Sequence, residues 1–107
     1  MSEDFDLNSF IGIESELEQE TTLKTPKMYS VVLHNDDYTT MDFVVRILVS
    51  VFHKPGAEAT MIMLDVHKKG VGICGVYTYD IALTKISQVY QLAAQNEFPL
   101  KCSLEET

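Results

Sequence analysis

The sequence predicts a two-layer α/β sandwich with the element order β-α-α-β-α-β. Three observations support this fold. Short runs of β-branched and apolar residues alternate with longer stretches that have apolar residues at helical spacing. Pro55 with Gly56, Gly70 and Pro99 separate these stretches, as chain breakers between elements do. The 107 residues are enough for one domain and too few for two.

Composition and charge exclude several classes of protein. Sixteen acidic residues against eight basic ones give a formal charge of -8, which disfavours binding to a nucleic-acid backbone. No apolar run approaches the roughly 20 residues that span a bilayer, and the acidic first ten residues do not resemble a secretory signal. Two separated cysteines, Cys74 and Cys102, fit neither a zinc nor a redox motif. We therefore expect a cytoplasmic protein with reduced thiols, no metal, no cofactor and no membrane or nucleic-acid partner.

The negative charge is concentrated near the N-terminus. Residues 1–27 hold seven of the sixteen acidic residues but only two of the eight basic ones. Their scattered apolar residues are too few for a core, and Pro26 closes the segment. We predict a flexible acidic N-terminal arm at 1–27 and a folded domain at 28–107. Whether the arm is a solvated tail or a tether that reaches a partner stays open.

The first half of the domain predicts one strand and one helix. Residues 28–33 are β-branched and apolar, which is typical of a short strand. A polar turn follows at 34–38. Thr39 then fits the N-cap of a helix, with Asp42 three residues later as the second member of a capping box. The almost continuous apolar residues of 41–53 predict a largely buried helix.

The second half predicts two more helices and two more strands. A helix over 57–67 ends at a cationic turn and Gly70. Residues 71–78 form a strand whose glycines indicate close backbone packing. A long helix covers 80–96, and Pro99 ends it. Alternating apolar residues then predict a last strand through Leu100, Cys102 and Leu104.

The densest polar cluster is Asn35-Asp36-Asp37, at a junction between strand and helix. Such residues are ordinary in turns, where they bond their own backbone. The alternative is a binding site, because two carboxylates beside an amide oxygen suit a cationic guest: a metal, an ammonium or a guanidinium. A metal would need further carboxylates from other segments, and few are placed to supply them.

A second candidate is His67, which shares a helix face with Met63 and Val66. That face would be apolar with a single polar tip. The simpler interpretation is a histidine that ends its helix and suits the negative C-terminus. No Ser-His-Asp spacing, glycine-rich phosphate loop or HExxH pattern occurs in the sequence.

Three segments carry a family resemblance. They read MYSVVLHNDDYTTMDFV, MLDVHKKGVGICGVYT and NEFPLKCSLEE. Together they resemble ClpS, the family of adaptors that deliver N-degron substrates to the ATP-dependent protease ClpAP. The resemblance covers about residues 27–106 and leaves out the arm. One departure is Thr40, where the family usually has proline.

The resemblance implies an α+β two-layer sandwich like the C-terminal domain of the ribosomal stalk protein, with a three-stranded antiparallel sheet packed on three helices. It also implies a function without turnover. The protein would be a monomeric adaptor, not an enzyme, that binds proteins with an N-terminal Leu, Phe, Tyr or Trp. Its second partner would be the N-terminal domain of the AAA+ unfoldase ClpA.

Site residues follow from the resemblance position by position. The α-amino group would be bound by Asn35, Asp36, Asp37, Thr39 and His67. A hydrophobic pocket for the first side chain would be lined by Met41, Val44, Met63, Val66 and Leu100. The unfoldase would be contacted by Asp80 and Lys85. Met41 would act as a gate against β-branched first residues.

Physical chemistry agrees with such a guest. A free N-terminus has a pKa of about 7.7–8.0, so it is mostly cationic at neutral pH and offers three donors. Protonation of His67 would replace its attraction for the ammonium group with repulsion. We therefore expect the affinity for the guest to decrease as the pH is lowered. Two other classes remain open. One is a small acid-base or metal-dependent enzyme that uses Asp36, Asp37 and His67, and the other is a ribosome-associated interaction module.

Overall fold

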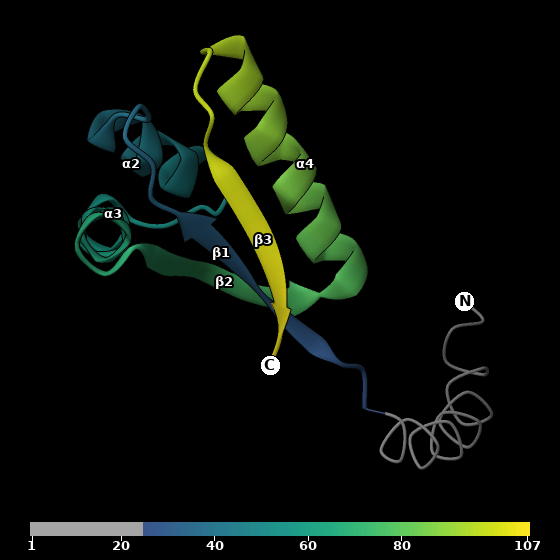
Figure 1. Cartoon of the computed structure of the whole chain (residues 1–107). Coiled ribbons are helices and arrows are strands. Elements are labelled where there is room, and N and C mark those ends of the chain that lie inside the picture. The colour runs from purple at the N-terminus through teal and green to yellow at the C-terminus, as the bar shows by residue number, and fades with distance from the viewer. Residues whose placement is uncertain (1–24) are drawn as a thin grey trace, which may run out of the picture.

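The computed structural model describes residues 25–107, which form an antiparallel sheet covered by helices (Figure 1). In these residues the element order is β-α-α-β-α-β, and the sheet has the strand order β2-β1-β3. The strands are β1 (Met28–His34), β2 (Val71–Thr78) and β3 (Lys101–Glu106). The helices are α2 (Met41–Ser50), α3 (Gly56–Lys69) and α4 (Tyr79–Gln95). The predicted α+β sandwich is confirmed, and the arm predicted for 1–27 lies almost wholly outside the described residues.

The core lies between the helices and one face of the sheet. β1 is central and pairs with both neighbours, so Val31 and Leu33 are fully buried between strands and helices. Cys74 of β2 and Cys102 of β3 are buried free thiols, and burial raises the pKa of both. They serve as small apolar core residues. Among the described helices, none has the length and hydrophobicity to cross a membrane.

The N-cap of α2 is Thr40, not the predicted Thr39. The Thr40 hydroxyl oxygen accepts a hydrogen bond of 3.2 Å from the amide of Phe43. Asp42 therefore occupies the second helical position and cannot complete a capping box, which requires the third. It still lies in the first turn, where a carboxylate suits the positive end of the helix. The first helical residue, Met41, agrees with the predicted range of 41–53, and at this end of the helix only the cap residue differs.

α3 packs closely on β2 because of a glycine. A Cβ atom added to Gly72 would lie 2.6 Å from the Val66 side chain and 3.1 Å from the carbonyl oxygen of Ile62. Only a residue without a side chain allows this approach. The close backbone packing predicted from the glycines is therefore confirmed at Gly72, and it fixes the position of α3 and of its last turn.

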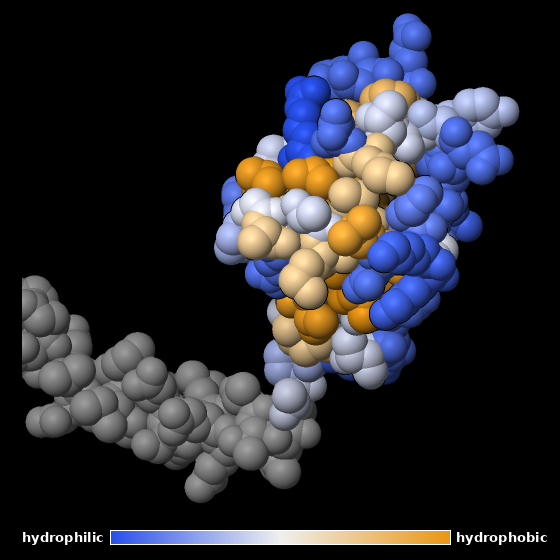
Figure 2. Space-filling view, turned by 90° about the vertical axis from the view of Figure 1, so that its left-hand side faces the viewer, coloured by the Kyte–Doolittle hydropathy of each residue, from blue (hydrophilic) through white to orange (hydrophobic). Residues whose placement is uncertain are grey.

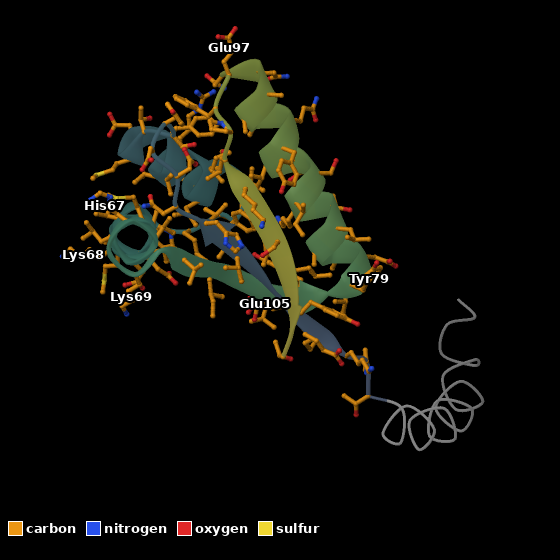
Figure 3. The ribbon with its side chains drawn as sticks, viewed as in Figure 1. His67, Lys68, Lys69, Tyr79, Glu97 and Glu105 are labelled. Carbon is orange, nitrogen blue, oxygen red and sulfur yellow. The ribbon has the colours of Figure 1, made fainter. Side chains whose placement is uncertain are left out.

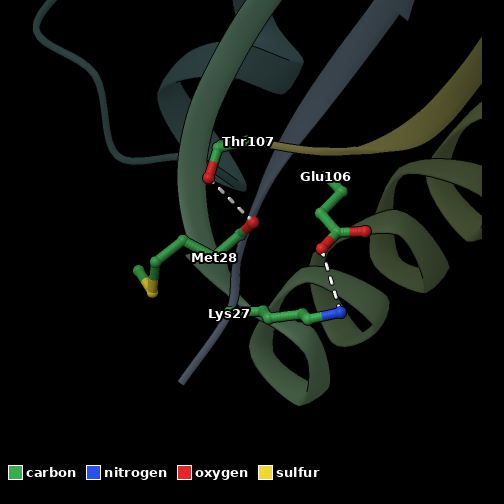
Figure 4. Close-up of polar contacts among 4 residues, drawn as sticks. All are labelled: Lys27, Met28, Glu106 and Thr107. Atoms are coloured by element: carbon green, nitrogen blue, oxygen red, sulfur yellow. Dashed lines mark hydrogen bonds and ion pairs between the residues drawn. The ribbon is translucent and has the colours of Figure 1, made fainter. Parts of the chain in front are cut away.

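The two ends of the described chain are joined beside β1 (Figure 4). The amide and hydroxyl of Thr107 donate to the carbonyl oxygen of Met28 at 3.1 and 3.0 Å. Lys27 and Glu106 form an ion pair at 3.2 Å, with both side chains largely exposed. These contacts secure the first residue of β1 to the end of β3.

Candidate functional site

A cavity of about 400 Å³ opens where the loop after β1 meets α2 and α3. This volume is in the range of cavities that hold small ligands. The lining combines polar residues of one loop, apolar residues of both helices and one histidine. The lining residues are Asn35, Asp36, Asp37, Tyr38, Thr39, Thr40, Met41, Val44, Met63, Val66 and His67.

One backbone hydrogen bond brings the loop to the end of α3. The amide of Asn35 donates to the carbonyl oxygen of Gly70 at 2.9 Å. Gly70 has a φ of 91°, the left-handed conformation that ends many helices, and its own amide donates to Val66. The polar loop is therefore attached to the helix turn that carries His67, so the two candidate clusters form one site.

Asp36 holds the loop in shape. Its Oδ1 accepts from the amides of Tyr38 and Thr39 at 2.8 and 2.7 Å, and its Oδ2 accepts from the Thr39 hydroxyl at 2.7 Å. Burial raises the pKa of this carboxyl, but the bonds from Thr39 and Tyr38 outweigh burial and hold the pKa below its ordinary value. Both oxygens are thus engaged inside the loop. Asp36 and Thr39 therefore hold each other in place at the edge of the cavity, which both of them line.

Three other polar side chains remain free to bind a guest. Within residues 25–107, no hydrogen bond or ion pair engages the side chains of Asn35, Asp37 or His67. All three are exposed and line the cavity. His67 projects from the last turn of α3, on the other side of that helix from Lys69 (Figure 3). An amide oxygen, a carboxylate and an imidazole nitrogen therefore face one opening, and all three can accept hydrogen bonds.

The floor of the cavity is apolar. Val44 of α2 and Val66 of α3 are buried, and Met63 is half-buried beside them. Met41, the first residue of α2, is 44% exposed and lies at the mouth. Hydrophobic side chains gather in the middle of the face that carries α2 and α3 (Figure 2). Leu100, which the resemblance implies for the pocket, is buried at 2% exposure and is not among the residues that line the cavity.

Asp80 and Lys85, the predicted unfoldase contacts, lie on α4 and line a shallow groove apart from the cavity. Lys85 Nζ donates to the carbonyl oxygen of Val51 at 2.7 Å and lies 5.8 Å from the centre of the Tyr77 ring. Its charge therefore stabilises the C-terminal end of α2. Asp80 is exposed in the first turn of α4.

The chemistry of the cavity fits an ammonium group joined to an apolar side chain. Charged and polar acceptors surround the mouth, and apolar groups form the floor. In the part of the chain that the structure describes, no three His, Cys, Asp or Glu side chains are grouped to hold a metal ion.

Sequence reasoning did not identify every lining residue. Tyr38 and Thr40 also line the cavity, although no binding role was predicted for either of them. In the sequence, only their position next to predicted site residues could have indicated that they line the cavity. The carbonyl of Gly70, which orders the site through Asn35, is a backbone group far along the chain. No local pattern could have indicated that contact.

Comparison with known proteins gives one consistent result. The family model for the ATP-dependent Clp protease adaptor protein ClpS matches residues 24–103. The ClpS of Syntrophus aciditrophicus is 64% identical over 93 residues, which cover 87% of each chain. That of Acetivibrio thermocellus is 62% identical over 88 residues, 82% of this chain and 89% of the relative. The solved structure of Agrobacterium tumefaciens ClpS2 bound to L-phenylalaninamide has a TM-score of 0.74 at 35% identity, covering 77% of this chain and 99% of that one.

Proposed function

Because the chain belongs to the ClpS family of ATP-dependent Clp protease adaptor proteins, we propose that its cavity binds the first residue of proteins that begin with Leu, Phe, Tyr or Trp. The bound protein is then delivered to the unfoldase ClpA of the ClpAP protease. A member of this family is an adaptor and not an enzyme. In this proposal it acts as a cytoplasmic monomer.

The observation that carries the proposal is the convergence of three free acceptors over an apolar floor. Asn35, Asp37 and His67 match the three donors of an α-ammonium group. Hydrogen bonds to a charged group contribute about 1.5–3 kcal/mol each. Burial of a Leu or Phe side chain adds about 1.5–3 kcal/mol. After the cost of association, these contributions suit micromolar or tighter binding.

The same acceptors select chain ends over chain interiors. An internal peptide nitrogen has a single donor and no charge, so it would leave the acceptors of the site unpaired. The ligand of the A. tumefaciens ClpS2 structure supports this choice of guest. L-Phenylalaninamide has a free α-amino group and an aromatic side chain, and its amide takes the place of the first peptide bond.

Met41 selects the first side chain by shape. It begins α2, its Thr40 neighbour caps that helix, and its side chain stands at the mouth of the cavity. A branch at the Cβ atom of the guest would collide with this wall, whereas Leu, Phe, Tyr and Trp are unbranched there. A binding series tests this part of the proposal. Peptides that differ only in the first residue should bind with Leu, Phe, Tyr or Trp and not with Ile or Val, and equal affinity for Leu and Ile would contradict it.

Delivery is assigned to the surface around Asp80 and Lys85 of α4, which contacts the N-terminal domain of ClpA in this proposal. Because Lys85 also stabilises the end of α2, Asp80 is the sharper test. Asp80→Ala should keep affinity for a Leu peptide but slow the degradation of a Leu-initiated reporter by ClpAP. Glu105→Ala, which removes an exposed acid of β3, is the matched control. Equal degradation rates in the two variants would argue against this surface.

A further inference from the structure

Tyr38 is a large aromatic residue at the cavity that the proposed function does not use. Its side chain is 76% exposed, the largest exposure among the large hydrophobic side chains of the described residues. Its backbone amide donates to Asp36 Oδ1 at 2.8 Å, so the residue is fixed at its Cα atom. The loop needs only that amide. The ring itself makes no close aromatic contact within residues 25–107.

Tyr38 lines the same cavity as the acceptors proposed for the α-amino group, and it is the most exposed of the large apolar side chains there. With the α-amino group among Asn35, Asp37 and His67, and the first side chain on the apolar floor, the chain exits past the remaining lining residues. Consecutive Cα atoms are 3.80 Å apart, so the second residue lies at the mouth. The hydroxyls of Thr39 and Thr40 there are already bonded to the loop and to the helix start. Tyr38 is the large side chain left for the second residue.

The charge around Tyr38 favours a cation. Two carboxylates, Asp36 and Asp37, precede it in the loop, and a bound α-ammonium balances only one of their two negative charges. The face of a tyrosine ring also attracts a cation, and a planar guanidinium stacks on it. We propose that Tyr38 selects the second residue of the bound chain and favours arginine there. This inference rests on the proposed function of the same cavity.

The test compares two peptides that differ in one group. Both begin with Leu, and the second residue is arginine in one and citrulline in the other, which replaces the guanidinium with a neutral urea of nearly the same shape. Fluorescence anisotropy measures both affinities for the full chain, for Tyr38→Phe and for Tyr38→Ala. The unmodified chain should bind the arginine peptide about two- to fivefold more tightly. Tyr38→Phe should keep this ratio, and Tyr38→Ala should lose most of it.

Each outcome is informative because the ratio is measured within one protein. Equal affinities for the two peptides in the unmodified chain would overturn the inference, and so would an unchanged ratio in Tyr38→Ala. In either case, tight binding of both peptides would leave the proposed function intact. If neither Leu peptide bound, or if their N-acetylated forms bound equally well, the proposed function itself would fail. Thermal unfolding curves of the two variants show whether each is folded.

Discussion

The backbone amide nitrogen of Asn35 lies 2.9 Å from the carbonyl oxygen of Gly70, and this hydrogen bond joins the two segments that form the site. Gly70 can present its carbonyl in this direction because its φ is 91°. His67 lies three residues before it, in the last turn of α3. The position of one histidine relative to the polar loop therefore depends on one glycine.

Replacement of that glycine should damage both stability and binding. A side chain in the left-handed conformation is strained by about 1–2 kcal/mol, so Gly70→Ala should lower the free energy of unfolding by a similar amount. Peptide affinity should fall as well, because the strain is relieved by movement of the turn that carries His67. Urea denaturation and a Leu-peptide titration measure the two effects.

Gly56→Ala is the matched control for this prediction. Gly56 begins α3 without a positive φ, and a Cβ atom there meets nothing within 4 Å. Alanine should be neutral or slightly stabilising at that position. Equal stability and affinity in the two variants would mean that the turn tolerates a side chain and that the contact with Asn35 does not order the site.

The pH dependence of stability should identify Asp36 as the residue that organises the loop. Its pKa is held below the ordinary value, so its carboxylate stabilises the fold above the unfolded-state pKa of about 3.9 and loses this effect as the pH falls through the lower folded pKa. Asp36→Asn should therefore be less stable at pH 7, by about 1 kcal/mol, the typical effect of such capping bonds. The difference from the unmodified chain should shrink at lower pH. Denaturant unfolding at a series of pH values measures this.

Asp37→Asn controls for the loss of a charge in the same loop. Asp37 makes no hydrogen bond in the described residues, so its replacement should leave stability nearly unchanged and weaken peptide binding instead. If the two variants lost equal stability at pH 7, the hydrogen bonds of Asp36 would not be what holds the loop.

The sequence was sufficient for the element order but not for the ends of α2. Apolar residues continue to Phe52, yet the helix ends at Ser50. Val51 and Phe52 are buried at 4% exposure, so their hydrophobicity reflects a core position rather than helical structure. The N-cap residue was also misassigned, for a different reason. Thr39 and Thr40 are equivalent caps by type, and Asp36 decides between them because it engages the hydroxyl of Thr39.

The residue types of the candidate site could be predicted from the sequence, but the hydrogen bonds that each residue makes could not. Asn35, Asp37 and His67 all line the cavity, as the family resemblance implies. That Asp36 is engaged inside the loop depends on three short bonds that no spacing specifies. Leu100 was placed in the pocket wall by the resemblance alone, and it is not among the residues that line the cavity. Its burial at 2% assigns it to the core.

Met41→Ala should relax the selection for the first residue of the guest. Shortening this side chain opens the mouth of the cavity, so Ile and Val peptides should gain affinity relative to a Leu peptide. The control is Met61→Ala, since Met61 is exposed on α3 and does not line the cavity. The ratio of Ile to Leu affinity should rise in the first variant only. A rise in neither variant would show that another group excludes branched residues.

Glu97→Gly should stabilise the protein by about 1 kcal/mol. Glu97 has a φ of 60° after α4, where the amides of Glu97 and Phe98 donate to the carbonyls of Ala94 and Ala93 at 3.1 and 2.9 Å. Glycine adopts this conformation without strain, whereas Glu97→Ala keeps the strain and serves as the control. Thermal unfolding compares the two. Equal melting temperatures would show that the left-handed conformation carries little strain here.

A titration of one Leu-initiated peptide against its N-acetylated form tests the central claim most directly. Acetylation removes the positive charge and two of the three donors while the side chain stays the same. If Asn35, Asp37 and His67 bind an α-ammonium group, the free peptide should bind in the micromolar range or tighter, and the acetylated one should show no measurable binding. Equal affinity for the two peptides would contradict the assignment of this cavity to protein N-termini.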